Sequence, residues 1–191
     1  MSDSELRHRL AAILAADVAG YSRLMARDEH ATLAALDAGR GVFRSCIESN
    51  QGRVIDMAGD SVLAVFETAS GAVSAALEIQ NALAASTAAT PEAQRMRFRI
   101  GIHLGDLIEK ADGTVYGDGV NIAARLEGLA EPGEIAVSGM VHEAVRSRVA
   151  ARFVDLGEQA VKNIAAPVRV FRIALGAAAA QGAPAPSAPA A

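Results

Sequence analysis

The chain has 191 residues, of which 51% are hydrophobic and 21% charged, and its formal net charge is −4. This length fits one domain with tails, and the acidic balance argues against nucleic-acid binding through a basic surface. No stretch approaches about 20 uninterrupted apolar residues, the N-terminus lacks the layout of a secretory signal, and the single cysteine (Cys46) cannot form an intrachain disulfide. We therefore expect a soluble cytoplasmic protein with no membrane span.

Apolar periodicity predicts alternating strands and helices over the first hundred residues. The cleanest alternation lies in 96–104, and Gly59-Asp60 separates two short apolar runs as a hairpin turn would. Asp28 is placed to cap the first long helix. The predicted elements are a strand over 10–16, a helix over 28–51, strands over 53–58 and 61–66, a helix over 70–85 and a strand over 96–104.

Shorter elements are predicted in the second half of the chain. A strand over 107–110 returns from the strand before it, and the turn at 111–113 follows. A helix over 117–129, a strand over 134–137, a helix over 140–148 and a strand over 168–173 complete the pattern. The predicted organisation is a flexible N-terminus over 1–6, one folded domain over 7–175, and a disordered Ala/Pro-rich tail over 176–191.

The strand and helix order of the first hundred residues is β-α-β-β-α-β, which indicates an α+β fold with a ferredoxin-like core and a C-terminal α/β extension. In that topology the first and third strands are antiparallel neighbours in the middle of the sheet. Asp17 ends the first and Asp60 precedes the third, so the two carboxylates should converge at one edge. Two carboxylates at one edge repel each other unless cations lie between them. In phosphoryl-transfer enzymes a pair of divalent metal ions commonly lies between such carboxylates. The alternative is two unrelated solvated carboxylates.

A turn and a later helix offer further polar groups. The turn Val18-Ala19-Gly20 follows Asp17 directly, and its backbone N–H groups could face a phosphate beside a cation held by that carboxylate. Asn121 and Arg125 are spaced i and i+4, so they project from one helix face, where an amide and a guanidinium could orient a ribose and stabilise a transferring phosphate. The alternatives are a helix cap at Asp17 and an ordinary exposed helix face.

Four motifs in one order resemble the catalytic domain of class III nucleotidyl cyclases, most of all the bacterial adenylate/guanylate cyclase proteins. The resemblance covers about 7–173, nearly all of the predicted folded chain. The motifs are A-A-D-V-A-G-Y-S-R-L-M, G-R-V-I-D-M-A-G-D-S-V-L-A-V-F, F-R-I-G-I-H-L-G-D and V-Y-G-D-G-V-N-I-A-A-R-L-E.

The resemblance implies conversion of a nucleoside triphosphate into a 3′,5′-cyclic monophosphate and pyrophosphate, with two divalent metal ions, Mg²⁺ or Mn²⁺, as cofactors. By matching position, Asp17 and Asp60 would be the metal ligands, Asn121 would orient the ribose and Arg125 would stabilise the transition state. It also implies a head-to-tail homodimer in which the aspartates come from one subunit and the Asn/Arg pair from the other. The residues that would contact phosphates are Val18, Ala19, Gly20, Tyr21 and Lys162, with Arg169 as an alternative to the lysine.

Base choice is where the sequence departs from the family. The family usually has a lysine four residues before the second metal aspartate, and here Asp56 stands there; Thr114 occupies the other base-recognition position. The resemblance to bacterial adenylate cyclases includes Thr114. The carboxylate of Asp56, when ionised, can only accept hydrogen bonds, so it also suits guanine, which offers donors. ATP is the favoured substrate. The alternatives are a guanylate or mixed-specificity cyclase, a cyclase-like regulatory module without turnover, and a ferredoxin-like binding domain with no nucleotide role.

Overall fold

A computed structural model describes residues 6–162 and 164–175. The predicted tail over 176–191 and most of the predicted flexible N-terminus lie outside these residues. The strands are β1 (Arg7–Val18), β2 (Gly52–Asp56), β3 (Val62–Phe66), β4 (Phe98–Glu109), β5 (Val115–Tyr116), β6 (Ile135–Ser138), β7 (Arg152–Gln159) and β8 (Val168–Ala174). The helices are α1 (Tyr21–Arg27), α2 (Glu29–Ser49), α3 (Ala69–Ser86), the 3₁₀ helix η1 (Glu92–Gln94), α4 (Asp118–Glu127) and α5 (Gly139–Val145).

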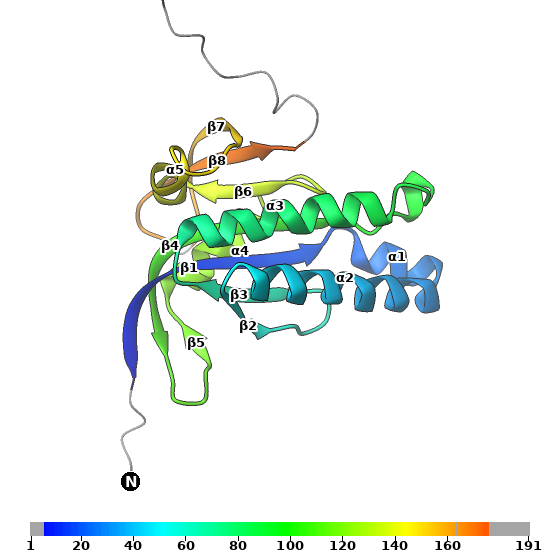
Figure 1. The fold of residues 1–191 in the computed structure, drawn as a ribbon, viewed down its shortest axis with the longest axis horizontal. Coiled ribbons are helices and arrows are strands. Elements are labelled where there is room, and N and C mark those ends of the chain that lie inside the picture. The colour runs from blue at the N-terminus through cyan, green and yellow to red at the C-terminus, as the bar shows by residue number, and fades with distance from the viewer. Residues whose placement is uncertain (1–5, 163, 176–191) are drawn as a thin grey trace, which may run out of the picture.

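One twisted sheet organises the molecule, in the strand order β2-β3-β1-β4-β6-β8-β7, with β5 paired to β4 (Figure 1). β1 lies between β3 and β4 and is antiparallel to both, as the ferredoxin-like topology predicts. The remaining strands extend the sheet beyond β4, which pairs in parallel with β6. The predicted α+β class with a ferredoxin-like core and a C-terminal extension is therefore confirmed.

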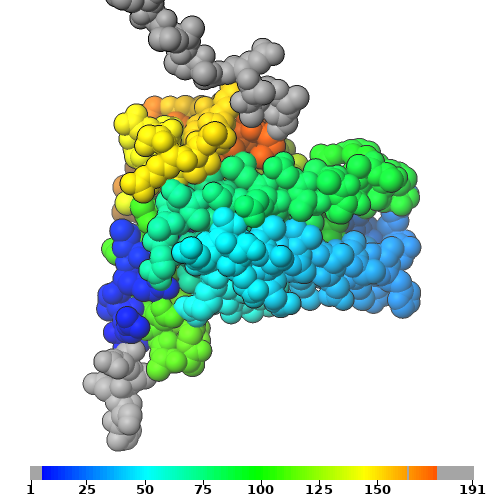
Figure 2. Space-filling view, in the orientation of Figure 1, coloured from blue at the N-terminus to red at the C-terminus, as the bar shows by residue number. Residues whose placement is uncertain are grey.

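Helices cover both faces of the sheet. The side chains of β1 alternate: Ala12, Leu14 and Ala16 belong to the large core cluster under α2 and α3, and Ala11, Ile13 and Ala15 belong to the cluster on the α4 side. Strands covered on both faces have near-continuous apolar sequences, and the central part of β1 shows this pattern. Figure 2 shows α2 and α3 lying side by side across one face.

Helix α4 lies unusually close to the sheet because β4 presents a glycine beneath it. A Cβ at Gly101 would lie 2.2 Å from the backbone nitrogen of Glu127 and 2.3 Å from the carbonyl oxygen of Ala123. The hydrogen of Gly101 is thus the only side chain that fits there. This contact fixes the distance between the C-terminal turn of α4 and the strand β4.

Local signals explain the helix starts. The Asp28 side chain accepts a hydrogen bond from the Ala31 N–H at 2.9 Å, so Asp28 caps α2 as predicted. Thr68 caps α3 in the same way, through the Gly71 N–H. Within the described ranges, no helix is both long enough and apolar enough to cross a membrane.

Three features of the fold differ from the prediction. The stretch 107–110 is not a returning strand: β4 runs unbroken to Glu109, which pairs in register with Arg7 of β1, and the chain returns only at β5. The Glu109 carboxylate binds both Arg9 and Arg53, which ties this end of β4 to β1 and β2. The sequence reading also missed α1 and β7. In β7 a register shift between Asp155 and Glu158 breaks the alternation that would have revealed it.

His103 is buried between β4 and α4. It is 6% exposed, and its Nδ1 atom has no hydrogen-bond partner in the part of the chain that the structure describes. Burial lowers the pKa of His103 to about 4, because desolvation penalises the imidazolium. The native protein therefore binds fewer protons than the unfolded chain between pH 4 and 6.5, and its stability falls as the pH is lowered through that window.

Replacing His103 with glutamine should flatten this pH dependence. From the pKa of about 4, the free energy of unfolding contributed by His103 should fall by about 2 kcal/mol between pH 7.5 and pH 5. Urea unfolding of the wild-type chain and the H103Q variant at both pH values measures this difference. Equal losses in the two proteins would show that other groups determine the acid sensitivity.

Candidate active site

Asp17 and Asp60 lie at the same edge of the sheet. Asp17 is the penultimate residue of β1, and Asp60 lies in the turn that leads into β3. The antiparallel register pairs Ala16 with Val62, which brings the two positions to adjacent strand ends. Both carboxylates act on the same neighbours, since the charges of Asp17 and Asp60 both raise the pKa values of Arg99 and Glu127. The convergence expected from the topology is present.

Arg99 binds Asp17 through two parallel hydrogen bonds. The Arg99 Nε donates to Asp17 Oδ1 at 2.8 Å, and Nη2 donates to Oδ2. This hydrogen bonding raises the pKa of Arg99 further above its ordinary value. The two residues are directly opposite each other in the β1–β4 register. Sequence reasoning missed this contact, although the alternation of β4 places Arg99 on the same face as Gly101, under α4.

Glu127, at the C-terminus of α4, is the second residue that sequence reasoning missed. Burial, the charge of Asp17 and a hydrogen bond to Asp17 raise the pKa of Glu127 to about 8. Burial and the nearby negative charge of Asp17 both disfavour the ionised form of Glu127. Glu127 reaches this position because the glycine at 101 lets α4 lie directly on β4.

This cluster fits a divalent cation. It contains more carboxyl groups than one arginine can neutralise, and carboxylate oxygens are the ligands that Mg²⁺ and Mn²⁺ prefer. Among the described residues, no group of three or more His, Cys, Asp or Glu side chains has the geometry to hold a metal ion. A cation at Asp17 and Asp60 would thus need further oxygens from water or a phosphate, as is usual for Mg²⁺.

An arginine on α2 holds the turn that carries Asp60. Arg40 donates Nη2 hydrogen bonds to the carbonyl oxygens of Met57, at 3.3 Å, and of Gly59. Gly59 has a φ of 57°, a conformation that favours glycine. The position of Asp60 is therefore set by α2 as well as by the β2–β3 hairpin.

The turn after Asp17 offers fewer amides than predicted. The Ala19 N–H donates to the Arg97 carbonyl oxygen at 2.9 Å, so it is directed into the protein. Gly20 adopts a left-handed conformation with a φ of 66° and precedes α1. Of the predicted phosphate-contacting residues, Val18 belongs to β1, which leaves the amides of Gly20 and Tyr21 for an anion.

Within one chain, the side chains of Asn121 and Arg125 are not directed toward the carboxylates of Asp17 and Asp60. Both are exposed on α4, whereas Gly119, Ala123 and Leu126 form its buried side. Glu127 faces the chain's own Asp17, whose negative charge raises the pKa of Glu127. One helix therefore has an inward carboxyl group and an outward amide–guanidinium pair.

The remaining predicted residues are also exposed and lie on other elements. Asp56 is at the end of β2, and Thr114 is in the β4–β5 connection, where its N–H donates to Asp112 Oδ1 at 2.9 Å. Lys162 is in the β7–β8 connection. The edge pair β7–β8 is separated from β1 by β4 and β6 in the sheet, so the chain does not bring Lys162 to Asp17.

The sequence matches the family model described as the adenylate and guanylate cyclase catalytic domain over residues 5–174. The chain belongs to this family. The recognition made from the four motifs is thus confirmed, and the sheet with α4 across Asp17 is a class III cyclase fold.

Individual relatives agree with this assignment. A crystal structure described as an adenylate/guanylate cyclase/hydrolase from Silicibacter pomeroyi has a TM-score of 0.85 and 44% identity, and covers 90% of this chain and 100% of that one. A Rhizobium meliloti protein that has the provisional name adenylate cyclase 3 is 45% identical over 90% of this chain. An adenylate cyclase of Streptomyces coelicolor is 30% identical over 76%. The chain spans only 29% of the Rhizobium protein and 37% of the Streptomyces protein.

Proposed function

We propose that this cyclase domain is an adenylate cyclase that converts ATP into 3′,5′-cyclic AMP and pyrophosphate at a homodimer interface, with two divalent metal ions. The observation that supports this most is the division of groups on α4: Glu127 faces the chain's own Asp17, while Asn121 and Arg125 face solvent. A second copy packed head to tail would add its exposed pair to the first copy's carboxylates. Relatives named adenylate cyclase favour ATP.

Each group then has a defined role. Asp17 and Asp60 would hold the cations, which when bound would favour ionisation of the ribose 3′-hydroxyl and neutralise phosphate charge. A cation at Asp17 would compete with the Arg99 guanidinium for the two carboxylate oxygens. The partner's Asn121 would orient the ribose, and the partner's Arg125 would stabilise negative charge on the transferring phosphate. The amides of Gly20 and Tyr21 would contact the phosphates.

A guanylate or mixed-specificity cyclase is the second candidate, and Asp56 favours it. Within residues 6–162 and 164–175 the Asp56 side chain makes no ion pair or hydrogen bond, and it is exposed. It is therefore free to accept hydrogen bonds from a base. Guanine offers N1–H and its 2-amino group as donors, and adenine offers its amino group to an acceptor.

A turnover assay distinguishes these candidates. The purified chain is given ATP or GTP, each with Mg²⁺ or Mn²⁺, and the cyclic products are separated by chromatography. We expect cyclic AMP to dominate. A dominance of cyclic GMP would make Asp56 the base selector. The absence of product with both nucleotides, from a chain shown to be dimeric, would contradict the enzyme proposal and favour a regulatory module.

A further inference from the structure

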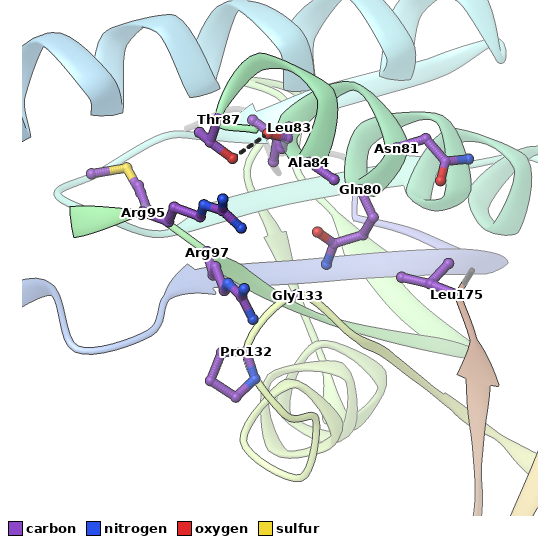
Figure 3. A pocket seen from close by; sticks show the side chains of 11 residues that line it. Gln80, Asn81, Leu83, Ala84, Thr87, Arg95, Arg97, Pro132, Gly133 and Leu175 are labelled. Carbon is purple, nitrogen blue, oxygen red and sulfur yellow. Dashed lines mark hydrogen bonds between the residues drawn. The ribbon is translucent and has the colours of Figure 1, made fainter. Parts of the chain in front are cut away.

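An arginine-lined pocket adjoins the turn that follows Asp17. Its volume is about 470 Å³, and its lining includes Gly20, Arg23, Arg95, Arg97 and Glu92. A second pocket of about 310 Å³, between α3 and the α4–β6 loop, shares Arg95 and Arg97 with it. Figure 3 shows the side chains of these two arginines side by side in that second pocket. Three guanidinium groups thus surround a cavity that contains one carboxylate.

Glu92 now occupies the position between two of these arginines. Its Oε1 lies 2.6 Å from Arg97 Nη2, and its Oε2 lies 3.1 Å from Arg95 Nη1. Arg95 is held in place by the carbonyl oxygens of Thr90, at 2.7 Å, and Ala88, at 2.8 Å. A carboxylate that places one oxygen on each guanidinium imitates the way a phosphate group is bound.

The third arginine, Arg23, has no acidic partner among the described residues. The Arg23 guanidinium lies over Gly20, where an added Cβ would be 3.5 Å from its Nη2. Within the described ranges, no carboxylate lies within ion-pair distance of Arg23. The pocket therefore has an excess of positive charge even with Glu92 in place.

The pocket lies next to the Asp17 site, because Ala19 and Gly20, which line it, closely follow Asp17 in the chain. The Arg97 carbonyl oxygen accepts a hydrogen bond from the Ala19 N–H at 2.9 Å, and Arg97 directly precedes β4, two residues before Arg99. Two residues of extended chain span about 6.8 Å. A chain of phosphate groups bound beside Asp17 would therefore extend toward Arg97.

We propose that Arg97, assisted by Arg23 and Arg95, binds the terminal phosphate groups of the nucleoside triphosphate and hence the pyrophosphate product. The Glu92 carboxylate takes the place of such a group between Arg95 and Arg97. Its carboxylate is 67% exposed, and exposed ion pairs contribute little, so a phosphate displaces it readily. This assignment rests on the proposed cyclase function.

Pyrophosphate binding to the full chain tests the assignment. Calorimetry with inorganic pyrophosphate and Mg²⁺ gives the Kd for the wild type and for the R97Q and E92Q variants. R97Q should raise the Kd about tenfold, because a charge-assisted hydrogen bond is lost, and E92Q should lower it about threefold. Matched controls are R146Q and E143Q, which break an exposed arginine–glutamate pair on α5 and should leave the Kd unchanged.

Turnover provides an independent readout. R97Q should raise KM for the triphosphate about tenfold and leave kcat within about twofold, since the contact exists in both ground and transition states. Unchanged pyrophosphate affinity in both R97Q and E92Q would overturn the assignment even if the wild type is an active cyclase. If the wild type makes no cyclic nucleotide, the opposite shifts of the two variants in calorimetry still support the anion site, and the cyclase proposal alone fails.

Discussion

Replacing Asp17 with asparagine should abolish cyclic-nucleotide production while leaving the fold intact. Asparagine keeps the shape of the side chain but removes the charge that a divalent cation requires. Removing a residue that only hydrogen-bonds to a metal ligand typically lowers metal affinity or activity about 10- to 100-fold. Removing a direct ligand should therefore lower kcat/KM by more than about a hundredfold. Electron paramagnetic resonance of Mn²⁺ should show weaker binding, and circular dichroism should be unchanged.

The matched control is E67Q. Glu67 also pairs with an arginine, Arg9, but at the opposite end of β1. Its replacement removes the same charge from a more exposed arginine–carboxylate pair and should leave turnover and Mn²⁺ binding near wild-type values. Equal losses in the D17N and E67Q variants would show that the effect comes from the net charge or the stability of β1, and would contradict the metal-site proposal.

Mixing separates the two halves of the proposed shared site. D17N lacks one half and an R125A variant lacks the other, so each homodimer should be inactive. Random exchange of subunits should restore about a quarter of the wild-type sites, because half of the dimers are mixed and each mixed dimer has one intact site. No recovery, with mixed dimers shown by mass spectrometry, would exclude a site built from two subunits.

The sequence predicted the fold and the convergence of Asp17 and Asp60 because both follow from strand order. Apolar periodicity located β1 to β4, and the ferredoxin-like order then placed the strand ends side by side. The same pattern could not place 107–110 in β4, because the ion pairs of Glu109 with Arg9 and Arg53 join residues far apart in the chain. Long-range pairing of this kind leaves no local signal.

Arg99 and Glu127 were missed for a related reason. Each looks ordinary by itself: an arginine in an alternating strand, and a glutamate at the end of a helix. Their importance depends on the register that sets Arg99 opposite Asp17 and on the close approach of α4 to β4. The glycine at 101, in F-R-I-G-I-H, is the one local sign of that approach, since a glycine inside a strand marks a close backbone contact.

Replacing Gly101 with alanine should be among the most destabilising single changes in the chain. The new Cβ would lie 2.2 Å from the Glu127 nitrogen and 2.3 Å from the Ala123 oxygen, and both are backbone atoms. Neither can move unless α4 shifts as a whole away from β4. Overpacking of this kind costs about 1–3 kcal/mol where side chains can adjust, and a rigid backbone contact should exceed this range.

Gly41→Ala is the internal control. Gly41 lies within α2, and an added Cβ there would meet no atom within 4 Å. Alanine should therefore raise the free energy of unfolding by up to about 1 kcal/mol, since it favours the helix over glycine. Urea unfolding at neutral pH should show opposite signs for the two variants. A small decrease in the free energy of unfolding of G101A, with unchanged Mn²⁺ binding, would mean that α4 can move without disturbing Asp17. It would contradict the assignment of Glu127 to the site.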